Sequence, residues 1–171
     1  MHLSSADIQA RVAELGARIC EDYAGKEPLL VGVLRASYVF LADLSRAVPI
    51  LHHLDLVSLA GYGRALGGHA GVRIMKDLDA PIAGRDVVIV DLVVDTGLTL
   101  NYLLTALRLR DPASLAVCSL LDRPYRRLVE DLPLRYVGFT VPDEFFVGYG
   151  FDLDGLHRGL PDIHSLNVAA K

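Results

Sequence analysis

The segment from residue 87 to residue 100 restricts the fold of this chain more than any other part of its sequence. An apolar, largely β-branched run contains Asp91 and is followed at once by Asp95. Such runs are typical of strands buried on both faces of a parallel sheet. Because an unpaired carboxylate is costly to bury, we expect both aspartates to emerge at the carboxyl edge of an open α/β sheet, where such sheets bind ligands.

The turn after this strand has the features of a phosphate cradle. Gly97 can adopt the positive φ that a tight turn requires, and a helix predicted over 98–109 offers free backbone N–H groups at its first turn. The hydroxyl groups of Thr96 and Thr99 add two further donors. The alternative interpretation is an ordinary strand-to-helix turn in which Asp95 caps the helix.

Strands and helices alternate along the rest of the chain. Ser4 and Asp7 form a capping-box pattern that predicts a helix up to about Tyr23, whereas the glycine-rich residues 61–71 indicate a mobile loop. Further strands are expected at 29–34, 51–59, 86–94, 114–121 and 135–140, with a second helix at 37–47. This alternation predicts an α/β fold with a mostly parallel, twisted sheet flanked by helices.

Length and charge exclude several classes of protein. A chain of 171 residues fits one domain, and 17 basic against 21 acidic residues argue against a nucleic acid or an anionic membrane surface as partner. The longest uncharged stretch, 96–107, is too short to span a bilayer. Charges near the start argue against a signal peptide, so we expect a cytoplasmic protein.

The two cysteines, Cys20 and Cys118, lack CxxC spacing and sit among apolar neighbours. We therefore expect buried, reduced thiols.

The strand-turn-helix segment resembles the phosphoribosyl pyrophosphate motif of the type I phosphoribosyltransferases, and residues 28–166 are similar to the hypoxanthine-guanine branch of that family. The resemblance implies one phosphoribosyltransferase domain over residues 1–171, with a small hood region and a flexible loop. It implies that Asp95 is the general base that acts on N7 of the purine. The residues implied for binding the phosphoribosyl group and its 5′-phosphate are Asp91, Thr96, Gly97, Leu98 and Thr99.

One position of the motif departs from the family pattern. Two adjacent acids precede the aliphatic pair in the family, whereas here Asp91 matches the first acid and Leu92 replaces the second. Two alternatives remain open for Leu92. Its side chain either faces the ribose, where an acid is missing, or packs into the core of the sheet.

The same resemblance implies a pyrophosphate site and a lid. Arg35 and Ala36 follow a strand directly and match the loop whose basic residue and cis peptide bind the leaving group, with Arg and Ala in place of the usual Lys and Gly. Arg158 matches a second pyrophosphate contact. Gly61 and Tyr62 match the Ser-Tyr of the flexible loop, which closes over the reaction and excludes water. Without the resemblance, Arg35 reads as a surface charge.

The purine site is implied by two further segments. Arg123 stands where the family has a Lys that donates to the oxygen at C6, and Arg is also a donor that never accepts. Phe145 matches the ring that stacks on the purine, and the backbone of Phe146 and of Asp152 matches the groups that read the edge of the ring. Taken alone, Arg123 reads as a solvated loop cation and the two phenylalanines read as core residues.

The metal implied by the resemblance is Mg²⁺, with Asp91 and Asp152 as carboxylate ligands beside the substrate phosphates. The six histidines form no recognisable metal motif, and adjacent His52 and His53 would point to opposite faces of a strand. No serine occupies a nucleophile elbow.

The expected activity is Mg²⁺-dependent transfer of a phosphoribosyl group from phosphoribosyl pyrophosphate to a 6-oxopurine, hypoxanthine or guanine. A weakly active or non-catalytic nucleotide-binding protein on the same fold is the first alternative, because Arg35, Leu92 and Arg123 are substitutions at ligand positions. A xanthine-preferring enzyme is the second. We also expect a homodimer or homotetramer.

Overall fold

A six-stranded sheet forms the centre of the molecule in the computed structural model, which describes residues 2–60 and 71–166. Its strand order is β4-β3-β2-β5-β6-β7, and all neighbours are parallel except β3 and β4. The strands are β2 (Leu29–Leu34), β3 (His53–Ala60), β4 (Arg73–Lys76), β5 (Asp86–Val94), β6 (Ser114–Asp122) and β7 (Leu134–Thr140). The predicted mostly parallel sheet is confirmed.

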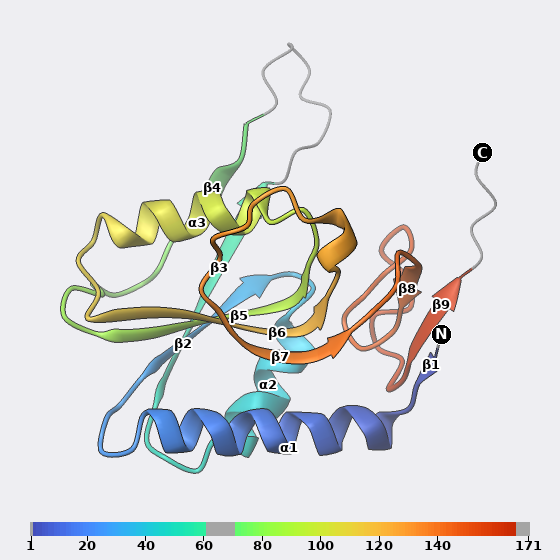
Figure 1. Ribbon diagram of the computed structural model, residues 1–171, viewed down its shortest axis with the longest axis horizontal. Coiled ribbons are helices and arrows are strands. Elements are labelled where there is room, and N and C mark those ends of the chain that lie inside the picture. The colour runs from blue at the N-terminus through green and yellow to red at the C-terminus, as the bar shows by residue number, and fades with distance from the viewer. Residues whose placement is uncertain (1, 61–70, 167–171) are drawn as a thin grey trace.

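Helices cover both faces of this sheet (Figure 1). Helices α1 (Ser5–Asp22) and α2 (Tyr38–Ala47) lie on one face, and α3 (Leu98–Arg108) lies on the other. Helix α1 begins with the predicted capping box, in which Ser4 and Asp7 exchange side-chain and backbone hydrogen bonds. No described helix is long and apolar enough to cross a membrane.

Strand β5 is buried from both sides, as its apolar run predicts. Val88 and Val90 belong to the hydrophobic cluster beneath α1 and α2, whereas Val87 and Ile89 belong to the cluster beneath α3. All four side chains are fully buried. Complete burial of a valine or isoleucine side chain contributes about 1.5–3 kcal/mol, so this strand fixes the position of the turn that follows it.

A second, three-stranded sheet forms the hood beside the carboxyl end of the main sheet (Figure 1). It consists of β1 (His2–Leu3), β9 (Ile163–Leu166) and β8 (Phe145–Val147), in the order β1-β9-β8 and antiparallel throughout. The sequence patterns did not predict these short strands. They also did not predict β4 or the 3₁₀ turn η1 (Pro124–Arg126).

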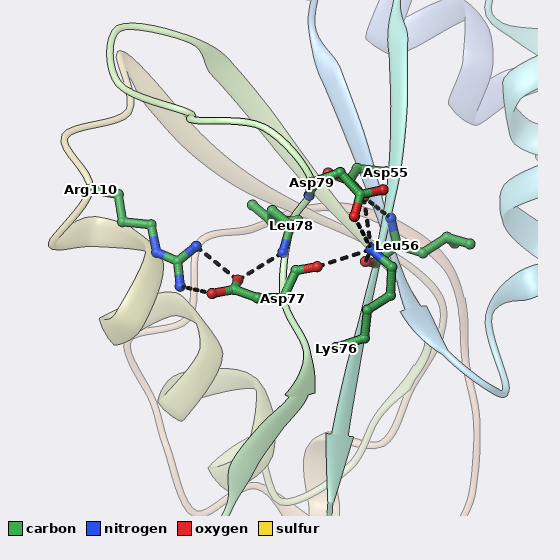
Figure 2. Close-up of polar contacts among 7 residues, drawn as sticks. All are labelled: Asp55, Leu56, Lys76, Asp77, Leu78, Asp79 and Arg110. Atoms are coloured by element: carbon green, nitrogen blue, oxygen red, sulfur yellow. Dashed lines mark hydrogen bonds and ion pairs between the residues drawn. The ribbon is translucent and has the colours of Figure 1, made fainter.

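A polar cluster holds the edge strand β4 to β3 (Figure 2). The Lys76 ammonium group lies 3.3 Å from Oδ1 of Asp55 and 3.0 Å from Oδ1 of Asp79, and it also donates to two backbone carbonyls. Asp55 accepts from the backbone N–H groups of Leu56 and Asp79. This buried carboxylate therefore has three donors.

Some predicted boundaries and features were wrong. The strand expected from residue 51 begins at His53, because His52 bonds instead to the Ile50 carbonyl and to Ser45. Both cysteines are free, but Cys20 is only partly buried whereas Cys118 is fully buried. Burial raises the pKa of the Cys118 thiol.

Candidate active site

The turn between β5 and α3 surrounds a hollow of about 130 Å³. Gly97 has a φ of 82°, and a Cβ at this position would lie 2.9 Å from a methyl group of Leu132. Gly97 is also the N-cap of α3, and the hydroxyl group of Thr96, not the carboxylate of Asp95, accepts from the N–H of Leu98 at the start of the helix. The alternative in which Asp95 is an ordinary helix cap is therefore wrong. The hollow is lined by Asp91, Val93, Val94, Asp95, Thr96, Gly97, Thr99 and Leu100.

Asp91 lies inside β5, paired with Ser119 of β6, and not in the turn that follows the strand. Its carboxylate nevertheless lines the hollow. Burial raises the pKa of Asp91 to about 7, although backbone N–H groups of Leu92 and Val93 partly oppose this shift. Among the described residues no cationic side chain pairs with this carboxylate, so a bound cation would favour its charged form.

Leu92 packs into the core and does not face the hollow. It is fully buried in the cluster beneath α1 and α2. Its Cδ2 atom also borders Gly150, where an added Cβ would lie 3.1 Å from it. Of the two alternatives for this position, the structure supports the packing role.

Asp95 emerges from the end of β5 between two arginines. Its Oδ2 atom lies 3.9 Å from Nη1 of Arg123, and its Oδ1 atom lies 3.2 Å from Nε of Arg126. Oδ1 is buried and forms no hydrogen bond with the described part of the chain. Two guanidinium groups therefore flank this carboxylate, and its Oδ1 atom keeps an unused capacity to accept a hydrogen bond.

Arg123 is held rigidly beside Asp95. Its side chain is 11% exposed, its guanidinium group lies 4.9 Å above the ring of Phe146, and it donates to the backbone carbonyl of Glu144. The interpretation of Arg123 as a solvated loop cation is therefore wrong. Its Nε is buried without a hydrogen-bond partner among the described residues, so one donor remains for a ligand.

Sequence reasoning missed two arginines of this site. Arg126 pairs with Asp95 and also with Asp143, and Arg127 donates to the backbone carbonyl of Asp95 and pairs with Asp122. Both belong to the turn after β6, which the sequence marked only by Pro124. The sequence does show two adjacent arginines shortly after a predicted strand. Whether their side chains reach Asp95 depends on the 3₁₀ turn, which the sequence patterns did not predict.

The predicted pyrophosphate loop lies between β2 and α2. The peptide bond between Leu34 and Arg35 is cis, as the resemblance implies. Arg35 is exposed, whereas Ser37 is fully buried and donates to the Val33 carbonyl at 2.7 Å. The loop backbone is thus anchored while its basic side chain faces solvent, which also fits the alternative of a surface charge.

Gly150 brings the pyrophosphate loop against the segment that follows β8. Its φ is 101°, and an added Cβ would lie 2.1 Å from the carbonyl oxygen of Ala36. Arg158 donates to the Gly150 carbonyl at 2.6 Å and pairs with Asp152 at 2.5 Å. Asp152 also accepts from the N–H of Gly155. The structure therefore joins Asp152 and Arg158 to each other and, through Gly150, to Ala36.

The two phenylalanines of β8 differ. Phe145 is 44% exposed, so its interpretation as a core residue was wrong, whereas Phe146 is 3% exposed and belongs to the core. The structure thus gathers Asp91, Asp95, Thr96, Gly97 and Thr99 at one hollow and adds Arg123. No described contact links Asp152 directly to Asp91. Gly61 and Tyr62 lie outside the described residues.

Three comparisons with known proteins agree with this geometry. The model of the phosphoribosyl transferase domain family matches residues 4–154. A hypoxanthine phosphoribosyltransferase of Salmonella typhimurium is 48% identical over 93% of this chain and 90% of its own length. A hypoxanthine-guanine phosphoribosyltransferase of Mycobacterium avium is 43% identical over 96% of this chain and 84% of its own.

The fold of this chain also matches that of a solved family member. The crystal structure of a hypoxanthine-guanine phosphoribosyltransferase from Bacillus anthracis superposes with a TM-score of 0.90 at 40% identity, and the match covers 96% of each chain. The family match spans the β5–α3 turn and the arginines that surround Asp95. This chain therefore belongs to the type I phosphoribosyltransferases, within their hypoxanthine-guanine branch.

Proposed function

We propose that this chain is a purine-salvage transferase that moves the 5-phosphoribosyl group of phosphoribosyl pyrophosphate to hypoxanthine or guanine. The products are the nucleoside 5′-monophosphate and pyrophosphate. The observation that carries the proposal is the pair formed by Asp95 and Arg123. Asp95 lines the hollow, and its Oδ2 atom lies 3.9 Å from Nη1 of Arg123. Oδ1 of Asp95 and Nε of Arg123 are each buried without a hydrogen-bond partner among the described residues.

Each of these groups suits one edge of a 6-oxopurine. The bond between C1′ and pyrophosphate oxygen breaks as the bond between C1′ and N9 forms, and the proton on N7 passes to the Asp95 carboxylate. Arg123 donates to the oxygen at C6, because a guanidinium group offers donors and no acceptor. The exposed ring of Phe145 is available to stack on the base.

The phosphate groups are assigned to backbone and hydroxyl donors. The first turn of α3 and the side chains of Thr96 and Thr99 border the hollow and suit the 5′-phosphate. Arg35, the backbone at Ala36, and Arg158 are assigned to pyrophosphate. Arg158 already pairs with Asp152, so this role requires the guanidinium group to share its donors.

Mg²⁺ is the proposed metal. The desolvated carboxylate of Asp91, which pairs with no cationic side chain of the described residues, fits a hard cation, which prefers oxygen ligands. Asp152 is the second proposed ligand. When bound with the diphosphate, the ion would neutralise charge that develops on the leaving group.

The experiment is pyrophosphate release measured with hypoxanthine, guanine, xanthine and adenine in turn. We expect adenine to be 10- to 100-fold poorer than hypoxanthine, because its N–H donor at C6 leaves the Arg123 donor unpaired at a cost of about 1–3 kcal/mol. Comparable turnover with adenine contradicts the assignment of Arg123. Pyrophosphate release with xanthine alone favours the xanthine-preferring enzyme. Absence of release with all four bases favours the weakly active or non-catalytic nucleotide-binding protein.

Assembly into a homodimer or homotetramer and the single-domain organisation of residues 1–171 stay predictions. Light scattering of the eluted protein measures the assembly directly. A mass equal to one chain contradicts the oligomer.

A further inference from the structure

The amino-terminal strand and the last strand of the hood bring two histidines together. In the antiparallel pair of β1 and β9, His2 stands directly opposite His164, and Figure 1 shows the two strands side by side. The neighbouring pair, Leu3 and Ile163, is buried. Since side chains alternate between the faces of a strand, the two imidazoles share the outer face.

A carboxylate completes this cluster. The imidazole rings are stacked with centroids 4.7 Å apart, and their Nε2 atoms lie 3.7 Å and 3.9 Å from the same oxygen, Oδ2 of Asp162. The three potential ligand atoms all lie within 4.8 Å of one another. No local spacing reveals this arrangement, because His2 and His164 come from opposite ends of the described chain.

Asp162 is held in place by its other oxygen. Oδ1 accepts the backbone N–H of Ser5 at 2.6 Å, at the first residue of α1. This bond orients the carboxylate and leaves Oδ2 facing the two histidines. Carboxylates that ligate metals are commonly fixed by such a hydrogen bond from outside the site.

We propose that His2, Asp162 and His164 form a binding site for a divalent transition metal of the Zn²⁺ class. Two imidazoles and one carboxylate are a donor set that suits such ions, with water in the remaining position. Ligand atoms about 2.0–2.1 Å from a tetrahedral ion lie roughly 3.4 Å apart, so the spacings of 3.7 Å and 3.9 Å are close to those required. The stacked imidazole rings must turn so that both Nε2 atoms face the ion. Exposed fractions of 53%, 32% and 45% leave the site open to ions from solvent.

This site differs from the proposed Mg²⁺ site in position and chemistry. Mg²⁺ favours oxygen ligands and does not suit two imidazoles. A metal bound here would link β1 to β9, and β9 also pairs with β8, which carries Phe145. The metal would thus add a second link between two strands of the hood that come from opposite ends of the described chain. The inference does not depend on transferase activity.

The test is titration of the chelator-treated, untagged full chain with Zn²⁺ by calorimetry, and with Co²⁺ by its visible absorption. We expect one equivalent to bind with a dissociation constant in the micromolar range or below. The unfolding temperature should rise as Zn²⁺ concentration increases, because the ion binds only the folded chain, whereas Mg²⁺ should have no such effect at this site.

Three variants and one control locate the binding. His2→Asn and His164→Asn should each weaken binding at least 10-fold. Asp162→Asn should do the same, although the amide oxygen can still accept from Ser5 and so keeps the contact with α1. His53→Asn, which removes another exposed histidine, should bind Zn²⁺ like the parent chain.

The proposal is overturned if the parent chain binds Zn²⁺ no tighter than about 1 mM. It is also overturned if His2→Asn and His164→Asn bind as tightly as His53→Asn. In that case the stacked rings are a packing feature only. All variants lie at the surface, and circular dichroism verifies that each is folded before titration.

Discussion

Two groups of aspartates in this molecule lie at neighbouring parts of the same sheet and have opposite electrostatic character. At the β3–β4 edge, burial alone would raise the pKa of Asp55. The backbone N–H groups of Asp79 and Leu56 and the ammonium group of Lys76 outweigh this effect, so the pKa lies below its usual value. Inside β5, burial raises the pKa of Asp91 to about 7. The difference lies in their partners: Lys76 and two backbone N–H groups donate to Asp55, whereas no cationic side chain among the described residues pairs with Asp91.

This comparison separates a structural carboxylate from a ligand-binding one. Both are desolvated, and desolvation alone would mark both as functional candidates. Both groups border a hollow, but only that of the β5 group includes the turn at the carboxyl edge of the parallel strands, where Oδ1 of Asp95 is buried without a hydrogen-bond partner among the described residues. The location of missing partners therefore identifies the site better than the location of charge.

The strongest test of the comparison is Asp95→Asn. Loss of a positioned general base should lower turnover by roughly 10²- to 10⁴-fold, while the first turn of α3 keeps its affinity for phosphate. Steady-state kinetics with hypoxanthine measures both quantities. Asp79→Asn is the matched control from the β3–β4 edge and should keep parental turnover. Parental turnover in Asp95→Asn would contradict the assignment of the base.

Leu92→Asp tests whether a carboxylate can be added beside Asp91 without a partner. Because Leu92 is fully buried, the new charge should lower the free energy of unfolding by several kcal/mol, about 3 or more. Leu92→Met is the control and should cost less than about 1.5 kcal/mol. Thermal unfolding and affinity for phosphoribosyl pyrophosphate are measured together. Tighter substrate binding with unchanged stability would mean that position 92 faces the ribose.

Asp55→Ala tests the structural cluster. It removes the acceptor of two backbone N–H groups and of Lys76, so the free energy of unfolding should fall by about 1–3 kcal/mol. Turnover at 25 °C should stay within about twofold of the parent, since the protein remains folded. Asp79→Ala, at an exposed side chain, is the control with a smaller effect. A large loss of turnover with unchanged stability would place Asp55 in the active site.

The smallest expected effect concerns pH. The lowered pKa of Asp55 contributes stability that is complete above the unfolded-state value of about 3.9 and is lost as pH falls through the folded-state value. The stability difference between the parent and Asp55→Ala should therefore shrink below about pH 4. Urea unfolding at several pH values measures it. A difference independent of pH would show that the charge of Asp55 contributes nothing.

The parts of the fold that depend on local patterns were predictable. The apolar run of β5 and Gly97 identified the strand and the turn that line the hollow. The family resemblance implied a hood region, but its strands were not predictable from local patterns, because β1 and β9 are short and pair across nearly the whole chain. The same holds for Arg126, whose contact with Asp95 depends on the turn η1. Family resemblance supplied Arg123 and Phe145, which composition alone left undecided.

The close approach at Gly150 makes three distant positions of the sequence interdependent. The carbonyl of Ala36 and a methyl group of Leu92 occupy the space that a side chain at position 150 would need. Positions 36 and 92 are both departures from the family pattern, and they meet at this one glycine. Substitutions at the three positions should therefore be non-additive, since neighbours that share a volume couple. Exchange of Leu92 for the family's acid alone, without its surroundings, would not recreate a relative's site.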